Sequence, residues 1–151
     1  MTVEPKDTVG ALDPSMPQVA ATPYLVTIAE FACANLVKGQ LEPGQITVGT
    51  RVVIDHLGAS KVGAELVVKA ALLNREKNRF RFSVEIEDGP RVVAKVEHER
   101  AAVSLEKIMK SLGYPLQLRP IVIARSAATK QSSSLARLLD CFAPLAMTKL
   151  D

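Results

Sequence analysis

The sequence has few of the residues that build disulfide frameworks, metal clusters or membrane spans. Its 151 residues include two cysteines, Cys33 and Cys141, two histidines and no tryptophan. Neither cysteine belongs to a CxxC or Cys/His cluster, so we predict no metal site. No apolar run approaches the roughly 20 residues of a membrane-spanning helix. No secretory signal is recognisable either. We therefore expect a cytoplasmic protein that has no membrane partner.

The excess of basic residues that is typical of nucleic-acid-binding proteins is absent from most of the chain. Residues 1–117 hold 14 Lys/Arg and 14 Asp/Glu, whereas residues 118–151 hold 5 and 2. The whole net charge of +3 therefore lies in the last segment. This balance argues against a nucleic-acid partner. The change in composition predicts a folded domain over 1–117 and a tail over 118–151.

A helix rich in apolar residues is predicted after an extended or turn-rich arm over residues 1–20. Thr22 and Pro23 indicate its start, with the Thr22 hydroxyl as N-cap, and Gly39 indicates its end. Apolar residues surround this segment, so we expect the helix to be buried. One ionisable residue, Glu30, stands in its middle with no cation three or four positions away. Such a carboxylate suits a general base or nucleophile, although a structural Glu paired with a distant arginine is the alternative.

Four strands are predicted after the helix, over residues 45–57, 64–74, 78–89 and 91–107. Their short spacings favour antiparallel hairpins. One helix followed by four such strands is typical of an α+β fold, in which an antiparallel sheet wraps around one central helix. This arrangement is the hot-dog fold. Alternation predicts these inward-facing residues: Ile46, Val48, Val52, Ile54, His56, Phe80, Phe82, Val84, Ile86, Val92, Ala94, Val96 and His98.

Two further residues stand out in the strands. Gly49 interrupts a strand, which indicates a bulge or a close backbone approach. His56 ends the same strand just before a loop. Each has a purely structural alternative, since an imidazole can be satisfied by a nearby backbone group. The Thr22 hydroxyl is similarly accounted for as a helix cap, and His98 as a strand residue near the sheet end.

The order Thr22, Glu30, Gly49, His56 resembles that of hot-dog thioesterases of the fluoroacetyl-CoA thioesterase type. The resemblance covers residues 4–112 and lies in "ATPYLVTIAEFAC", "LEPGQITVGTRVVIDHLGAS" and "VEHERAAVSLEK". It implies an acyl-CoA thioesterase that needs no cofactor and forms a homodimer with sites at the subunit interface. It also implies that Thr22, Glu30 and His56 form the catalytic set and that the Gly49 N–H binds the thioester oxygen. Whether Glu30 is base or nucleophile stays open.

Two departures from the family pattern bear on the substrate and on the sheet. The family shapes a fluorine-selective lid with aromatic residues before its threonine, where this chain has "LDPSMPQVAA". We therefore expect a short or medium acyl group rather than selectivity for fluoroacetyl-CoA. The family also carries a strand before the segment "MTVEPKDTVGAL", so we expect either an incomplete start or an exposed sheet edge.

Two other functions remain open, and the tail has two interpretations. The chain could be a non-catalytic hot-dog dimer that binds acyl-CoA. An enoyl-CoA hydratase is disfavoured, because those enzymes pair Asp and His in a motif that is absent here. Residues 118–151 resemble translated copies of a bacterial intergenic repeat. The alternative for this tail is a basic amphipathic segment that contacts a membrane or a partner.

Overall fold

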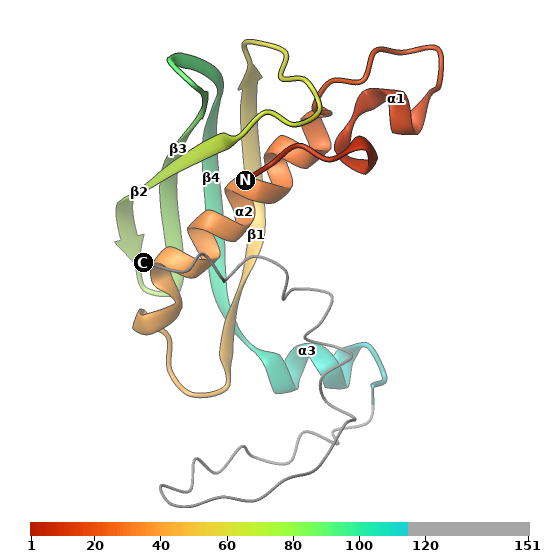
Figure 1. Ribbon diagram of the computed structural model, residues 1–151. Coiled ribbons are helices and arrows are strands. Elements are labelled where there is room, and N and C mark those ends of the chain that lie inside the picture. The colour runs from red at the N-terminus through yellow and green to blue at the C-terminus, as the bar shows by residue number, and fades with distance from the viewer. Residues whose placement is uncertain (115–151) are drawn as a thin grey trace, which may run out of the picture. The chain divides into compact units, whose positions relative to one another are not determined.

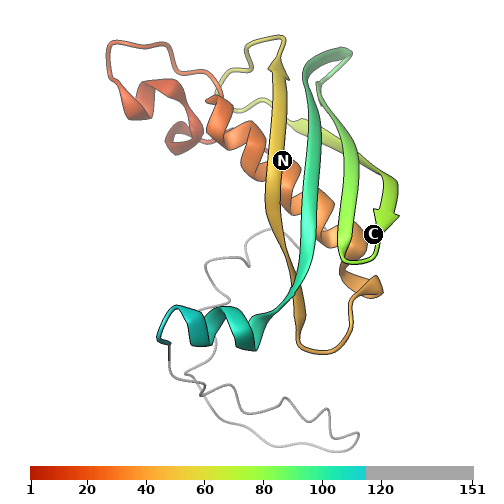
Figure 2. The same ribbon diagram turned by 180° about the vertical axis from the view of Figure 1, so that it is seen from behind.

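One long helix lies against one face of a four-stranded antiparallel sheet in the computed structural model, which describes residues 1–114 (Figure 1). Figure 2 shows the opposite, open face of that sheet. The strand order is β1-β4-β3-β2. This arrangement confirms the predicted α+β class, whereas the predicted tail over 118–151 lies outside the described residues. The elements are η1 (Pro5–Asp7), α1 (Val9–Leu12), α2 (Thr22–Val37), η2 (Lys38–Gln40), β1 (Gln45–His56), β2 (Leu66–Glu76), β3 (Arg79–Asp88), β4 (Arg91–Ser104) and α3 (Leu105–Ser111).

The N-terminal arm is turn-rich, as predicted, and hydrogen bonds hold both ends of the loop that it contains. Thr8 and Ala20 form an antiparallel bridge, and Thr8 caps α1 by accepting a hydrogen bond from the Ala11 N–H. The Thr8 hydroxyl is also 2.9 Å from Oε1 of Gln18. Residues 11–18 between these contacts are all exposed. The arm therefore holds a protruding loop in a fixed place directly before α2.

The start of α2 differs from the prediction by one residue. The N-cap is Ala21, and Thr22 and Pro23 are the first two helical residues. Proline still fits this position, because an N–H in the first helical turn has no intrahelical acceptor. The predicted capping role of the Thr22 hydroxyl is therefore wrong. That hydroxyl is available for another partner.

Only one side of α2 is buried in the protomer, so the expectation of a helix buried on every side is not met. Its buried residues are Leu25, Ile28, Ala29, Cys33 and Val37, which lie at helical spacing and join the core. Glu30 and Ala34 are only partly buried, and Leu36 is exposed. The other side of the helix is apolar in sequence, but its residues are only half-buried or exposed.

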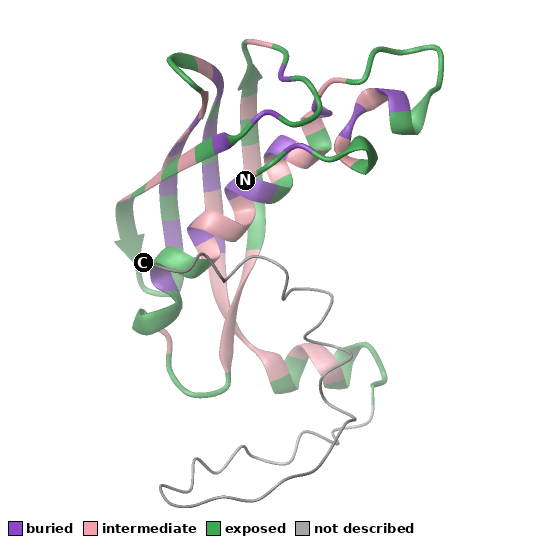
Figure 3. Cartoon of the chain, in the orientation of Figure 1, coloured by how far each residue is buried: buried purple, intermediate pink, exposed green. Residues whose placement is uncertain are grey.

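The core between helix and sheet is built by the inward faces of β3 and β4, whose buried residues alternate with exposed ones (Figure 3). Phe80 and Phe82 are fully buried, with ring centroids 6.4 Å apart. The predicted inward residues Phe80, Phe82, Val84, Ile86, Ala94 and Val96 are all buried. Period-two alternation predicted them correctly because one face of this sheet is packed and the other is solvated.

A bulge in β1 overturns part of the predicted face. Gly49 pairs with Arg100 and Arg51 pairs with Glu99, so Thr50 is the extra residue. An inserted residue reverses the alternation beyond it. Val52 and Ile54 pack against the core as predicted. Ile46 and Val48, however, lie on the outer face.

One inward residue and one end of β4 also differ from the prediction. A register shift opposite Ile86 and Glu87 buries Val93, so Val92 is not part of the inward face. The strand ends at Ser104, whose hydroxyl caps α3, and the predicted strand over 105–107 is the start of that helix. Among residues 1–114, no helix is long and apolar enough to cross a membrane.

Replacing Phe82 with alanine should lower the free energy of unfolding by about 3–5 kcal/mol, because it leaves a cavity against α2. Chemical denaturation monitored by circular dichroism measures this change. Leu73→Ala is the matched control, since the Leu73 side chain is 65% exposed. Equal losses in the two variants would contradict the packing described for β3.

Candidate active site

Glu30 of α2 and Gly49 of β1 meet where the helix crosses the edge of the sheet. A Cβ added at position 49 would overlap Oε1 of Glu30 and lie 3.1 Å from the His98 ring. Glycine is therefore required here by close approach. The predicted neighbourhood of Glu30 and Gly49 is present in the structure.

The charge that compensates Glu30 comes from β4. Nη1 of Arg100 is 3.9 Å from Oε1 of Glu30, and Nε2 of His98 is 3.8 Å from the same oxygen. An arginine distant in sequence therefore does lie beside Glu30, as the structural alternative for this residue expects. The Glu30 side chain is 41% exposed in the protomer, so its surroundings are polar and partly open rather than sealed.

Thr22 and His56 form a second pair, at the start of α2 and the end of β1. Oγ1 of Thr22 is 2.9 Å from Nδ1 of His56, and Nε2 of His56 is 3.1 Å from the Gly58 carbonyl oxygen. A carbonyl can only accept, so Nε2 carries a proton, and in the neutral ring Nδ1 accepts from the Thr22 hydroxyl. This arrangement suits proton transfer between a hydroxyl and an imidazole.

The two pairs lie apart within one protomer. Thr22 and Glu30 are eight residues apart on the same helix, which corresponds to about 12 Å along its axis. No hydrogen bond or ion pair among the described residues joins Glu30 to Thr22 or His56. The structure therefore brings Thr22 to His56 and Glu30 to Gly49, but it does not unite all four in one chain.

His98 and Arg100 are site residues that the sequence reasoning missed. The sequence indicates His98 only as a strand residue near the sheet end, yet its side chain is fully buried next to Glu30. A signal was present, because Ala94, Val96, His98 and Arg100 share one face of β4. Two polar residues that continue an apolar core face indicate a buried polar cluster.

Cys33 does not provide a nucleophile at this site. The residue is fully buried, and burial raises the pKa of its thiol to about 12. A thiol is nucleophilic only as thiolate. Within residues 1–114, no three His, Cys, Asp or Glu side chains gather as a metal site would require.

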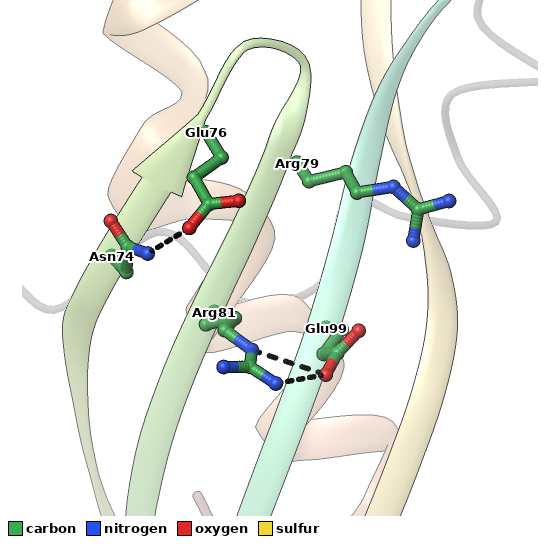
Figure 4. A pocket seen from close by; sticks show the side chains of 5 residues that line it. All are labelled: Asn74, Glu76, Arg79, Arg81 and Glu99. Atoms are coloured by element: carbon green, nitrogen blue, oxygen red, sulfur yellow. Dashed lines mark hydrogen bonds and ion pairs between the residues drawn. The ribbon is translucent and has the colours of Figure 1, made fainter.

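A separate pocket lies on the outer face of the sheet, away from Glu30. It has a volume of about 270 Å³ and is lined by Asn74, Glu76, Arg79, Arg81 and Glu99. Figure 4 shows the side chains of Arg81 and Glu99 directed at each other across neighbouring strands. Nε of Arg81 is 3.2 Å from Oε1 of Glu99. Its lining holds two arginines and two glutamates, so the formal charges of this pocket balance.

Comparison with known proteins identifies the family. The fluoroacetyl-CoA-specific thioesterase family matches residues 3–106. The chain belongs to this family. It is also 34% identical over 111 residues to the fluoroacetyl-CoA thioesterase of Streptantibioticus cattleyicolor, which corresponds to 70% of this chain and 80% of that protein. The predicted family is thereby confirmed.

Solved structures confirm the hot-dog fold. A structure of the fluoroacetyl-CoA thioesterase superposes with a TM-score of 0.70 at 32% identity, covering 75% of this chain and 88% of that one. A phenylalanine-to-alanine mutant of that thioesterase in complex with fluoroacetate and CoA gives 0.68 at 32% identity, covering 75% and 93%. A hot-dog-like protein from Thermanaerovibrio acidaminovorans has the same fold, with a TM-score of 0.69 at 21% identity over 75% and 84%.

Replacing Gly49 with alanine should displace the Glu30 carboxylate and lower kcat of thioester hydrolysis by about 100-fold, because catalytic groups tolerate little misplacement. Gly39→Ala is the matched control, since an added Cβ there has no atom within 4 Å. Thioester hydrolysis and thermal denaturation of both variants check this. Unchanged turnover in Gly49→Ala would show that the close approach does not matter.

Proposed function

We propose that this protein hydrolyses short or medium acyl-CoA thioesters to a carboxylic acid and CoA, as a homodimer, with Glu30, Thr22 and His56 in the reaction. Membership of the thioesterase family supports thioester hydrolysis. The observation that carries the assignment of residues is the Glu30 carboxylate lying directly over the Gly49 backbone. The proposed reacting carboxylate of Glu30 is thus next to a stretch of backbone that a substrate can approach closely.

The chemistry needs three things that these residues supply. The Glu30 carboxylate is partly exposed, so it is accessible either to activate water or to attack the thioester carbonyl. The Gly49 N–H is proposed to bind the developing oxyanion, since no Cβ keeps the carbonyl away. The thiolate of CoA is a good leaving group. His56 and Thr22 are proposed to transfer the proton, so neither a metal nor a redox cofactor takes part.

The homodimer is proposed because the two pairs lie apart in one protomer and because, among residues 1–114, β1 has a neighbouring strand on one side only. β1 stands at the edge of the sheet and is 12 residues long, with Val53 exposed. Such an edge is a template for pairing with another strand. A second copy pairing antiparallel about a two-fold axis beside Val52 and Val53 would set Gly49 opposite His56 of the partner subunit. Glu30 of one chain would then meet the Thr22–His56 pair of the other.

The acyl group is proposed to be short or medium because of the loop before α2. This loop presents Leu12, which is 74% exposed, and Met16, which is 46% exposed. Both are flexible aliphatic side chains, which adapt to acyl groups of different shapes better than rigid aromatic rings do. We therefore propose a broader substrate range than fluoroacetyl-CoA alone.

A second candidate function is a non-catalytic dimer that binds acyl-CoA. It is favoured by the separation of Glu30 from Thr22 and His56 in the protomer. If the chains associate in another register, the substrate would be held without a complete catalytic set. Binding of an acyl-CoA without release of thiol would identify this case.

Glu30→Gln should lower kcat by at least about 100-fold on every acyl-CoA that the wild type hydrolyses, because the amide keeps the shape but neither accepts a proton nor attacks. A thiol-release assay with acyl-CoAs of increasing length measures this and gives the acyl preference. Glu42→Gln, an exposed carboxylate away from the site, is the control. Full activity of Glu30→Gln would refute the assigned role.

Mixed dimers test whether two subunits share each site. Glu30→Gln and His56→Ala should each be inactive alone, yet co-refolding them should restore about a quarter of wild-type activity. Half of the dimers are then mixed, and each has one site with both residues intact. No recovery, with dimers present by light scattering, would show that Glu30 and His56 act within one chain.

A further inference from the structure

Arg100 is held more firmly than any surface arginine would be. The residue is only 6% exposed. Its Nε donates to the Thr47 hydroxyl at 2.9 Å, and Nη2 donates to the Thr47 carbonyl at 2.8 Å. Nη1 donates to the Glu30 backbone carbonyl at 3.4 Å and lies 3.0 Å from Nε2 of His98. Every nitrogen of the guanidinium therefore has a defined partner.

The bond between Arg100 and His98 fixes the proton on the imidazole. Nδ1 of His98 is 2.9 Å from the Arg51 carbonyl oxygen, which can only accept, so Nδ1 carries the hydrogen. Arg100 cannot accept a hydrogen bond, so Nε2 must be the acceptor. His98 is thus neutral, with its free lone pair directed at Nη1. Burial has the largest effect on the pKa of His98 and lowers it, and the nearby Arg100 charge acts in the same direction.

A neutral His98 leaves Arg100 as the cation beside Glu30. Besides His98 and Arg100 of β4, the groups facing this carboxylate are Gly49 of β1 and the neutral Cys33 thiol of α2. Burial lowers the pKa of Arg100, but a guanidinium stays charged in proteins. The 3.8 Å contact between His98 and Glu30 is therefore not an ion pair.

We propose that His98 and Arg100 are positioning residues of the hydrolytic site: His98, by accepting from Nη1, holds the guanidinium of Arg100 beside the Glu30 carboxylate, 3.9 Å from Oε1. This inference rests on the proposed function. A purely structural role explains His98 and Arg100 poorly. Apolar residues at these two positions would continue the core face of β4 without the cost of removing a charged group from water. A buried charge is expensive unless it is fully bonded. Here four hydrogen bonds hold a cation that faces a carboxylate open to substrate.

The tautomer of His98 in the wild-type protein is the first test. Nitrogen-15 chemical shifts of the two ring nitrogens distinguish the neutral forms from each other and from the cation. We expect a neutral ring protonated at Nδ1 at about pH 7. A ring protonated at Nε2, or a charged ring, would overturn the proposal. This measurement needs no variant and so does not depend on whether one folds.

A matched pair of variants tests the role in turnover. His98→Gln places an amide oxygen near the position of Nε2, so it can still accept from Arg100. His98→Asn reaches only the position of Nδ1 and loses that acceptor. We expect kcat to fall about 10- to 100-fold in His98→Asn and only a few-fold in His98→Gln, with similar KM in both. Equal losses in two folded variants would refute the positioning role.

A double-variant cycle separates positioning through Arg100 from a direct effect. In an Arg100→Met background, His98→Asn should cause little further loss of kcat, because the group that His98 orients is gone. Additive losses would contradict the proposal. Glu30→Gln distinguishes the two levels of inference. If neither wild type nor any variant releases thiol, the proposed function fails, and if Glu30→Gln stays active, only the role assigned to Glu30 fails. In both cases the His98 tautomer still reports on the His98–Arg100 pair itself.

Discussion

The structure depends on accommodating one carboxylate between an apolar helix and a sheet. Glu30 lies over Gly49, where β1 carries no side chain, and beside Arg100, which is buried in the inner face of β4. The helix α2 introduces the negative charge, β1 leaves space for it, and β4 supplies the positive charge beside it. A larger residue at 49 would displace the carboxylate, and an apolar residue at 100 would leave its charge without the neighbouring cation. Three elements distant in sequence are thus constrained together by electrostatics as much as by packing.

The same constraint divides the inner face of the sheet into two regions. Phe80, Phe82 and Val96 form a dry core against α2, whereas His98, Arg100 and Thr47 form a fully bonded polar cluster beside it. Buried polar clusters stabilise a single arrangement only when every member has a partner. Within residues 1–114, no buried side-chain nitrogen or oxygen lacks one. The bulge at Thr50 reverses the alternation of β1, so Thr47 and Gly49 share the inner face with Val52.

Much of the fold could be predicted from the sequence. The inward residues of β3 were predictable because burial on one face makes apolar and polar residues alternate, and the start of α2 was predictable because proline favours the first turn of a helix. The reversal in β1 was not predictable, since a bulge depends on pairing with β4 and not on the strand alone. Thr22 was wrongly predicted as a helix cap, because a threonine that caps a helix and one that bonds to His56 look the same in sequence. Glu30 and Gly49 stood out in the sequence by themselves, and the family resemblance assigned them to one site. Arg100 was overlooked because its partners, Thr47 and Glu30, are separated from it by 53 and 70 positions.

The rigidity of α2 decides how a complete site can form. Thr22 and Glu30 are on one continuous helix, so no loop movement within the protomer changes the roughly 12 Å between them along its axis. If both pairs take part in the proposed reaction, they act at different points of a long substrate, or residues of another chain complete each of them. A thioester carbonyl is a single point, so the first possibility cannot place both pairs at the reacting atom. Under the proposed homodimer, a second copy would complete each pair at the edge of β1, which carries Gly49 and His56 and has no neighbouring strand on that side among residues 1–114.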